Sequence, residues 1–447
     1  MKTPYPHQTA AIEVIDRKNL LLSDDCGLGK TLVAIIAGSQ QVPRFNRSGL
    51  IIVPKTLREQ WQQEILAQDF TSSAIELFDG QRSIDRLNST DLPMFTIIHY
   101  EAVVKWVNEL ERVFFSFICV DEAHRIKNRS AQRTSAIKRL VAHRKLAMTG
   151  TPYDKNPADV WSILNWLEPD FFRSYWQFYN SHVNYKEIEV SRGKWVKVIN
   201  KAQPVRDTEN FARLLRQFSL KRTKKEVRSD LPERIDQYVD LQMNSDQADY
   251  YAKIVNAEDM LVALDDNELN DQLITIQLTR ILRLIQVTTD PTLLGVKSSS
   301  VKLNWVMDWL EDNPSESVII FTRFRETAIK LHKQLEGFQL IIGGEKRRII
   351  TSEDRGIVGT IATMGVGLDL PHIDNAIFID VEWSSILMQQ AIDRIHRINI
   401  DNVKHLYFLR CQDTVDELVY RAVRDKWSTK ELVENFLRGS VALQREI

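Results

Sequence analysis

The sequence predicts an α/β fold with two lobes, each built on a parallel sheet, and helical insertions between them. Short apolar stretches alternate with amphipathic helical stretches from the N-terminus to about Pro169, and again from about Val301 to Cys411. The segment between these regions lacks that alternation, and its apolar residues recur at a period near 3.6, which is typical of helices. A chain of 447 residues is also too long for one typical core, which favours two or three domains.

In the first region, short apolar stretches predict strands and amphipathic stretches predict helices. Their alternation places the strands side by side in one parallel sheet. The expected strands are Asn19–Ser23, Leu50–Val53, Phe95–His99, Phe117–Val120 and Lys145–Met148, with helices at Lys30–Ser39 and Leu57–Ala67.

The middle of the chain and the second region are interpreted in the same way. Polar and apolar residues alternate over Lys186–Ile199, around Arg192-Gly193, which predicts a small hairpin. Helices are expected at Asn210–Phe218, Asp246–Leu264 and Gln272–Ile285 in the middle, and at Lys302–Glu311, Glu326–Glu336, Ile386–His396 and from Asp413 onward. The expected strands of the second region are Val318–Thr322, Gln339–Ile342, Ile357–Ala362, Ala376–Asp380 and Lys404–Leu409.

These elements suggest three regions along the chain. We expect lobe 1 over residues 1–228, with a helical insertion at about 170–220. A helical insertion or linker is expected over 229–300, and lobe 2 over 301–447 with C-terminal helices that brace it. Ser298–Ser300 is a short polar break before lobe 2.

Composition limits the class of protein. With 43% hydrophobic and 27% charged residues, the chain is expected to be an ordinary globular protein. Its net charge of -1 neither supports nor excludes nucleic-acid binding. Cys26, Cys119 and Cys411 fit neither a disulfide framework nor a zinc site. We expect no signal peptide and no membrane span, and a cytoplasmic location in a bacterial or viral source, or a nuclear one if the source is eukaryotic.

A glycine-containing segment between a predicted strand and a predicted helix has the pattern of a phosphate-binding loop. It runs from Asp24 to Thr31 (DDCGLGKT), and Gly27 and Gly29 would let backbone N–H groups approach the phosphates of ATP. We expect Lys30 to reach the β- and γ-phosphates and Thr31 to hold Mg²⁺. Asp24 stands where the strict pattern has glycine, and a chance glycine turn is the alternative.

Two acidic residues follow the strand predicted at Phe117–Val120. A carboxylate at the carboxyl end of a parallel strand faces the ligand crevice of the sheet. We therefore expect Asp121 to orient Mg²⁺ and Glu122 to position or deprotonate the attacking water, with a surface acid pair as the alternative. His124 is interpreted as a coupling residue, because no second His or Cys is spaced to join it at a metal.

Near the other end, Arg394 and Arg397 are three residues apart and would share one helical face. Guanidinium groups presented across a cleft can stabilise charge on a transferring γ-phosphoryl group. We expect this catalytic role, with a solvated basic helix face as the alternative.

These motifs occur in the order found in superfamily-two helicases, and the chain resembles the SWI/SNF-type DNA translocases among them. The resemblance includes Tyr5-Pro6-His7-Gln8, and implies that Gln8 contacts the adenine base. It also implies two RecA-like lobes that close on one ATP with Mg²⁺. Further matching segments are Ile51–Trp61, Thr96–Val103, Thr149–Pro152, Leu220–Pro232, Ile319–Phe324, Ile361–Leu370 and Gln389–Arg397. Trp383-Ser384-Ser385 and Asn399-Ile400 depart from the family pattern.

The resemblance also places the nucleic acid. It implies further nucleotide contacts by Gly367 and Asp369. It implies DNA contacts by Lys55, Thr56, Tyr100, Lys127, Asn128, Thr322, Arg323, Thr363 and Gly365. The basic run Lys221–Lys225 is either a duplex contact, a brace between lobes or a solvated face. Trp176 and Trp195 are expected to pack in the core, with stacking on bases at a fork as the alternative.

The functional prediction is an ATP-dependent translocase or helicase of double-stranded DNA that binds without sequence preference and acts as a monomer. Within the family, the compact insertions are most similar to annealing helicases and fork-remodelling members, which favours branched or forked DNA. One alternative is a motor that displaces proteins such as RNA polymerase from DNA. An alternative from another class is a non-motor DNA-binding scaffold.

Overall fold

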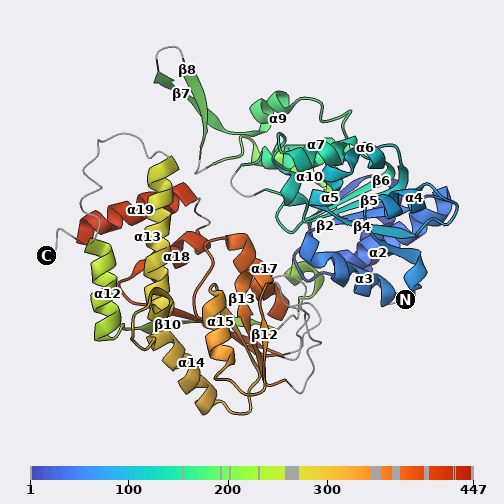
Figure 1. The fold of residues 1–447 in the computed structure, drawn as a ribbon. Coiled ribbons are helices and arrows are strands. Elements are labelled where there is room, and N and C mark those ends of the chain that lie inside the picture. The colour runs from blue at the N-terminus through green and yellow to red at the C-terminus, as the bar shows by residue number, and fades with distance from the viewer. Residues whose placement is uncertain are drawn as a thin grey trace. The chain divides into compact units, whose positions relative to one another are not determined.

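The computed structural model describes residues 3–153, 156–191, 194–200, 203–229, 232–256, 271–343, 354–364, 373–396, 402–425, 427 and 429–443. The chain divides into two compact units, Met1–Ser229 and Asp230–Ile447, and each is treated by itself. Figure 1 labels the helices and strands of both units.

Unit 1 is built on a parallel sheet of seven strands in the order β3-β4-β2-β5-β6-β1-β9. Its inner strands are apolar and buried, as expected where helices cover both faces of a parallel sheet. The five predicted strands are present, and two strands of three and two residues, β3 and β9, were not predicted. The strands are β1 (Leu20–Leu22), β2 (Gly49–Val53), β3 (Ile75–Leu77), β4 (Phe95–His99), β5 (Phe114–Asp121), β6 (Val141–Met148) and β9 (Ser219–Leu220).

Helices connect these strands. The helix after the phosphate-binding loop, α2, runs six residues beyond its predicted end at Ser39. Gly38 lets α2 approach the sheet, because a Cβ there would lie 2.7 Å from the ring of Phe95. The helices are α1 (Pro6–Arg17), α2 (Lys30–Phe45), α3 (Arg58–Leu66), α4 (Gln81–Leu87), α5 (Tyr100–Lys105), α6 (Val107–Leu110), α7 (Gln132–Arg139) and α8 (Asp159–Leu167), with short turns η1 (Lys55–Leu57), η2 (Ser72–Ala74) and η3 (Ala123–Ile126).

An insertion precedes the last strand of unit 1. It contains α9 (Tyr175–His182), the antiparallel hairpin of β7 (Tyr185–Ser191) and β8 (Lys194–Ile199), and α10 (Thr208–Phe218). The short helix α11 (Lys224–Val227) follows β9. The hairpin projects away from the sheet of its unit (Figure 1), and its prediction is confirmed. The expectation that Trp176 and Trp195 pack in the core is wrong, because they are 54% and 61% exposed on this insertion.

Unit 2 is built on a second parallel sheet, in the order β10-β15-β14-β11-β13-β12. Its edge strand β10 lies where helix or linker was expected, and it pairs with β15 along its whole length. The alternation of charged and apolar residues in β10 reflects a half-exposed edge strand. The strands are β10 (Arg234–Leu241), β11 (Val318–Thr322), β12 (Phe338–Ile341), β13 (Gly356–Thr360), β14 (Asn375–Phe378) and β15 (Lys404–Cys411).

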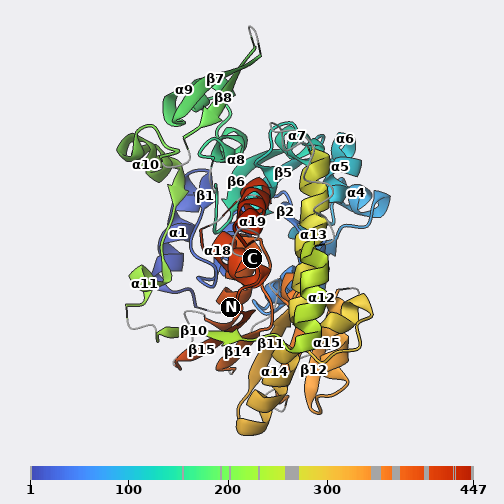
Figure 2. The same cartoon turned by 90° about the vertical axis from the view of Figure 1, so that its left-hand side faces the viewer.

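The helices of unit 2 cover its sheet and extend from it. The helix α12 packs against α13 (Figures 1 and 2), and residues 257–264 of the helix predicted there lie outside the described residues. Lys302 of α14 forms a buried ion pair of 2.6 Å with Asp416 of α18. The helices are α12 (Ser245–Asn256), α13 (Asp271–Thr289), α14 (Val301–Asp312), α15 (Arg325–His332), α16 (Ile361–Met364), α17 (Ser385–Ile395), α18 (Val415–Arg424) and α19 (Thr429–Leu443), with the turn η4 (Pro291–Leu294).

Within the described part of the chain, no helix has both the length and the hydrophobicity needed to cross a bilayer.

Candidate nucleotide-binding site

The predicted phosphate-binding loop joins the carboxyl end of β1 to the first turn of α2. Gly27 and Gly29 have φ angles of +87° and +75°, which only glycine adopts readily. Gly29 is the N-cap of α2, so the unpaired N–H groups of that helix begin at Lys30. The Lys30 Nζ donates to the carbonyl oxygens of Asp24 and Asp25, at 2.6 and 3.1 Å, and thus lies over the loop.

Gln8 closes the loop from the side of α1. Its Nε2 donates to the carbonyl of Leu28 at 3.1 Å, and its Oε1 accepts from the backbone N–H of Tyr5 at 2.9 Å. A Cβ on Gly29 would lie 2.2 Å from the Gln8 Nε2, so only glycine permits this approach. Gln8, predicted to contact the adenine base, is therefore fixed directly beside the phosphate-binding loop.

These residues fit ATP with Mg²⁺. A 16-residue helix begins at a glycine loop that leaves no room for a side chain, and this arrangement binds phosphate through backbone N–H groups. Lys30 would hold the phosphates, and the Thr31 hydroxyl with the Asp121 carboxylate would hold Mg²⁺, which keeps most of its ligands as water and phosphate oxygens. Bound Mg²⁺ would supply positive charge to the β- and γ-phosphates.

Asp121 is the last residue of β5, two strands from β1 in the sheet, so both ends lie on the same sheet edge. The Trp61 Nε1 donates to its Oδ2 at 2.9 Å, and the backbone N–H of Glu122 donates to its Oδ1 at 2.9 Å. Burial, and then the negative charge of Glu122, raise the pKa of Asp121 to about 6, while the hydrogen bonds and Lys30 oppose this shift. Trp61 thus orients the carboxylate, a role that the sequence did not indicate.

Glu122 has a φ of +51°, in the left-handed region, and is the N-cap of η3. Tyr100 supports this turn, since its hydroxyl donates to the carbonyl of Asp121 at 2.5 Å and to that of Glu122 at 3.3 Å. Tyr100 is only 1% exposed, and burial together with the two carboxylates raises its pKa well above the usual value. Tyr100 was predicted to contact nucleic acid; its hydroxyl is engaged with this turn, and the contact stays a prediction.

His124 joins the turn to the neighbouring strand. Its Nδ1 lies 3.3 Å from the Glu122 Oε2 and 3.3 Å from the Oγ1 of Thr149, which directly follows β6. A Cβ on Gly150 would lie 3.2 Å from the Sγ of Cys26, so the segment after β6 also packs on the phosphate-binding loop. This arrangement is consistent with His124 as a coupling residue.

Arg222 explains why Asp24 can replace the glycine of the strict loop pattern. The Asp24 side chain is 2% exposed and forms an ion pair with the Arg222 guanidinium, whose Nε donates to the Asp24 Oδ1 at 3.0 Å. The backbone N–H of Arg222 donates to the same oxygen at 3.0 Å, and Arg222 also donates to the His7 carbonyl. The basic run Lys221–Lys225 is therefore not simply a solvated face, because Arg222 holds the phosphate-binding loop through Asp24.

Four of the predicted nucleic-acid contacts lie on exposed loops of unit 1. Lys55 and Thr56 are exposed in η1, just after β2. Lys127 and Asn128 are exposed just after η3, where the Lys127 Nζ lies 3.4 Å from the Asp159 carboxylate. All four follow carboxyl ends of parallel strands, so they share a sheet edge with the phosphate-binding loop.

The predicted contacts of unit 2 are placed differently. The side chain of Thr322 is fully buried and its hydroxyl donates to Asp380 at 2.9 Å, and its contact with nucleic acid stays a prediction. The Arg323 guanidinium stacks on Trp383 at 3.8 Å and pairs with Glu382 at 3.3 Å, which leaves its side chain 14% exposed. The hydroxyl of Thr363 on α16 lies 2.9 Å from that of Thr360, and the predicted residues Gly365, Gly367 and Asp369 lie outside the described residues.

The predicted arginine pair is described only in part. Arg394 lies in α17, whose helical assignment confirms the predicted helix, and Arg397 lies outside the described residues. Ser384, in the segment that departs from the family pattern, is the N-cap of α17 and accepts from the N–H of Leu387 at 3.4 Å. The departure from the family pattern therefore preserves the start of this helix.

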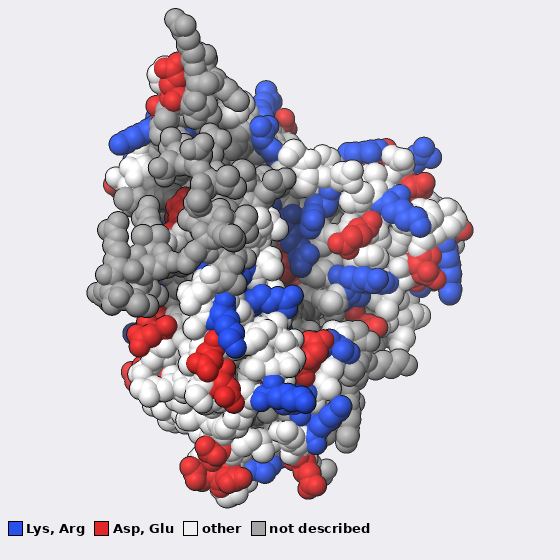
Figure 3. All heavy atoms as spheres, turned by 60° about the vertical axis from the view of Figure 1, so that its left-hand side comes forward, with Lys and Arg blue, Asp and Glu red and all other residues white. Residues whose placement is uncertain are grey.

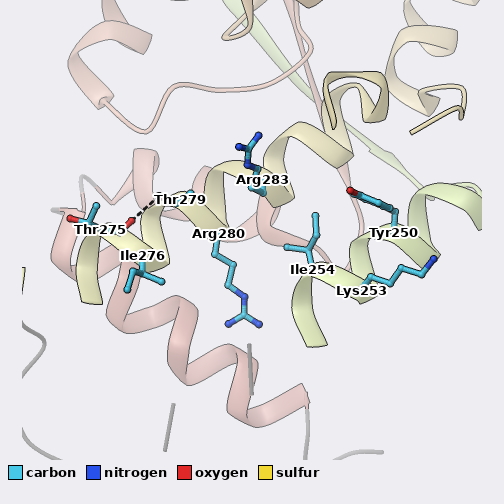
Figure 4. Close-up of a pocket in the computed structure, with 8 residues that line it drawn as sticks. All are labelled: Tyr250, Lys253, Ile254, Thr275, Ile276, Thr279, Arg280 and Arg283. Carbon is cyan, nitrogen blue, oxygen red and sulfur yellow. Dashed lines mark hydrogen bonds between the residues drawn. The ribbon is translucent and has the colours of Figure 1, made fainter. Parts of the chain in front are cut away.

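Two further features lie outside the site. On the face shown in Figure 3, basic and acidic side chains are interspersed over the described surface. A pocket of about 480 Å³ lies between α12 and α13 (Figure 4). Lys253, Arg280 and Arg283 line it, and Arg280 extends toward α19, 5.5 Å from the Phe436 ring. No residue predicted for ATP or DNA lines this pocket.

Comparison with known proteins gives two family matches and several relatives. Residues 9–293 match a profile described as SNF2-related domain, and residues 301–399 match a helicase conserved C-terminal domain. An uncharacterized ATP-dependent helicase of Mycoplasma genitalium is 26% identical over 444 residues, which cover 93% of this chain and 40% of that protein. The ISWI chromatin-remodelling complex ATPase of Saccharomyces cerevisiae is 26% identical over 452 residues, which cover 92% and 39%. The helicase domain of Pyrococcus furiosus Hef has a TM-score of 0.55 at 15% identity, over 93% of this chain and 97% of that one. The chain spans about two fifths of the length of the two curated relatives.

Proposed function

This chain belongs to the SNF2-related family, with a helicase C-terminal domain after it, and we propose that it uses ATP hydrolysis to move along double-stranded DNA. Its two parallel sheets are the RecA-like lobes of α/β type that the sequence predicted. The family makes it an ATPase of the helicase type. Translocation, the DNA substrate and the residue roles below are the proposal.

One observation carries the proposal: the phosphate-binding loop, Gln8 and the Asp121-Glu122 pair converge at one edge of the first sheet. Lys30 and Thr31 would bind the phosphates and Mg²⁺, while Gln8 would contact the base. Glu122 would position the attacking water and accept its proton, because it begins the turn η3 and its carboxylate lies 3.3 Å from the His124 ring nitrogen.

The second unit would complete the reaction through Arg394 and Arg397. Guanidinium groups that contact the γ-phosphoryl stabilise the charge that develops as it leaves, an effect worth about 10³- to 10⁵-fold in rate. Differential affinity of the two lobes for ATP and its products would then drive closing and opening, and with it a change of grip on the DNA backbone.

Lys30→Ala tests the nucleotide assignment. We expect ATPase activity on linear duplex to be abolished while the thermal midpoint stays within a few degrees of wild type. Lys105→Ala, which removes an exposed lysine of the same unit, is the matched control and should leave turnover unchanged. Near wild-type turnover in Lys30→Ala would exclude this site.

Displacement of a third strand from a triplex by the wild-type chain would test movement along duplex. We expect displacement that requires ATP and that Lys30→Ala abolishes, because a stationary scaffold cannot push a bound strand ahead of it. ATP hydrolysis that duplex stimulates without displacement would contradict translocation.

Within this function we propose branched or forked DNA as the substrate. Lys55, Thr56, Lys127 and Asn128 suit the phosphate backbone, since lysines, hydroxyls and amides bind phosphate oxygens without reading sequence. ATPase stimulation by linear, forked and four-way DNA of equal length is the test. Stronger stimulation by the branched forms is expected, whereas a motor that strips proteins from DNA would respond equally to linear duplex.

A further inference from the structure

The insertion of unit 1 carries exposed indole rings that neither the proposed nucleotide site nor the proposed duplex contacts use. Trp176 on α9 is 54% exposed and Trp195 on β8 is 61% exposed, whereas Trp61, Trp161 and Trp166 of the same unit are at most 7% exposed. Indoles present flat faces that stack on other rings. Two of them on one insertion, one on α9 and one on the hairpin, form a surface suited to a partner with flat apolar groups.

Cations accompany these rings. The Arg129 guanidinium lies 4.4 Å from the ring of Tyr175 and 5.8 Å from that of Trp176. The Lys197 Nζ lies 4.2 Å from the ring of Tyr185 and 5.6 Å from that of Trp176, so it joins the hairpin to α9. Side chains two residues apart on a strand share a face, so Trp195 lies on the face of Lys197, one step nearer the tip. We call Arg129, Trp176, Trp195 and Lys197 the stacking surface.

The charge of this region is positive. Residues 185–201 contain five Lys or Arg and two Glu, and residues 125–133 contain four Lys or Arg and no acid. Glu187 lies 3.9 Å from Lys197, so part of the positive charge is neutralised locally, and Glu189 is the cross-strand neighbour of Trp195. The remainder favours an anionic partner.

Aromatic rings beside cations bind single-stranded nucleic acid, because each base has a π face and each nucleotide a phosphate. A duplex hides its base faces within its own stack, so the rings could be used only where bases are unpaired. Arg129 directly follows Lys127 and Asn128, the proposed duplex contacts, so the two surfaces are continuous along one loop. We propose that the stacking surface binds the unpaired nucleotides at the branch point of a DNA fork. This inference rests on the proposed function and adds the element that would recognise a branch.

Fluorescence anisotropy with the full chain tests the proposal, using a linear duplex and the same duplex with single-stranded arms. Trp195→Ala and Trp176→Ala are each expected to weaken fork binding about tenfold or more, because a stacked base contributes about 1–3 kcal/mol. Binding to linear duplex should change less than about twofold. Trp195→Phe should retain most of the fork affinity, since a phenyl ring still stacks.

Tyr238→Ala is the matched control. Tyr238 is 53% exposed on β10 with Arg410 5.2 Å from its ring, so it is an exposed aromatic beside a cation in the other unit. Its loss should not affect fork binding. A halogenated uracil at the first unpaired position of the fork should crosslink under ultraviolet light to a peptide containing Trp176 or Trp195.

The outcomes separate this inference from the proposed function. If the wild-type chain hydrolyses ATP on linear duplex but the tryptophan variants bind forks normally, the inference is overturned and the proposed motor function is retained. The stacking surface would then contact another protein or serve only the packing of the insertion. Equal weakening on linear and forked DNA also overturns it, since the contact would then not be to unpaired bases. If wild type binds neither DNA, the proposed function fails first.

Discussion

Replacing Arg222 with methionine is expected to loosen the phosphate-binding loop and weaken ATP binding. Methionine retains an unbranched chain of similar length but removes the charge and every hydrogen bond that the guanidinium makes to Asp24. The Asp24 carboxylate, 2% exposed, would then keep only the backbone N–H of Arg222 among these partners. Asp24→Asn with Arg222→Met removes the stranded charge as well.

The magnitude follows from the burial of the pair. Removing one partner of a buried ion pair costs about 3–5 kcal/mol, because an uncompensated charge remains. Arg222 keeps 20% of its side-chain exposure, which places the expected cost of Arg222→Met near the lower end, about 3 kcal/mol. The double variant should recover part of this cost, and the difference from additivity measures the coupling of the two side chains.

Hydrogen exchange of the backbone amides at the start of α2, read by mass spectrometry, is the assay. If the loop opens independently of the rest of unit 1, a reduction of about 3 kcal/mol in its opening free energy makes amide exchange about a hundredfold faster. ATP affinity should fall in proportion to the fraction of molecules whose loop is competent. The exposed pair Arg44–Asp16, at 2.7 Å in the same unit, provides the control, and Arg44→Met should cost less than about 1 kcal/mol.

Equal effects of Arg222→Met and Arg44→Met on hydrogen exchange and on ATP affinity would contradict a role of Arg222 in holding the loop. Arg222 would instead be the duplex contact that its basic run suggests if Arg222→Met impaired DNA binding and left ATP binding intact.

Three other substitutions test the packing around the site and in unit 2. Tyr100→Phe should destabilise the fold by about 0.5–1.5 kcal/mol and slow ATP hydrolysis without weakening DNA binding, because it removes the hydroxyl that donates to the carbonyls of Asp121 and Glu122, of which the Glu122 carbonyl still accepts from the N–H of Arg125. Lys302→Met should destabilise unit 2 by about 3–5 kcal/mol in urea unfolding, since it strands the Asp416 carboxylate. Burial lowers the pKa of His182 in the folded chain, so the unfolded chain binds a proton at this residue more tightly. Protonation therefore favours unfolding: the folded state has its full stability above about pH 6.5 and loses part of it as the pH falls. His182→Phe should therefore reduce the loss of melting temperature between pH 7.5 and 5.5.

The fold was predictable where strands are buried on both faces, because such strands are continuous apolar runs bounded by polar residues. The stretch Val318–Thr322 is strand β11, residue for residue. The strand β10 was missed because charged residues alternate along it, and its pairing with β15 depends on residues far away in the sequence. A strand of two residues such as β9 has no pattern of its own and exists only because β1 lies beside it.

The nucleotide site was predictable to the extent that its residues are adjacent in sequence. Glycines before a lysine, or two acids after a strand, are local signals. The partners that fix these residues come from elsewhere in the chain: Trp61 from α3, Tyr100 from α5 and Arg222 from the segment between β9 and α11. A lone indole in the polar segment of α3 was a weak signal, and Asp24 in a glycine position was a stronger one, since a buried carboxylate requires a cation.

The turn η3 relates the two halves of the proposed mechanism. It begins at Glu122, held in a left-handed conformation, and ends at Ile126, directly before Lys127 and Asn128. A left-handed residue other than glycine is strained, and it persists only when its surroundings hold it. Here Tyr100 and His124 hold it, on either side of the acid. Because a single turn of backbone separates Glu122 from the exposed Lys127, a displacement of the loop by bound DNA would reach the carboxylate without an intervening flexible segment. We therefore predict that Tyr100→Phe, which slows hydrolysis overall, lowers the rate measured with DNA more than the rate measured without it.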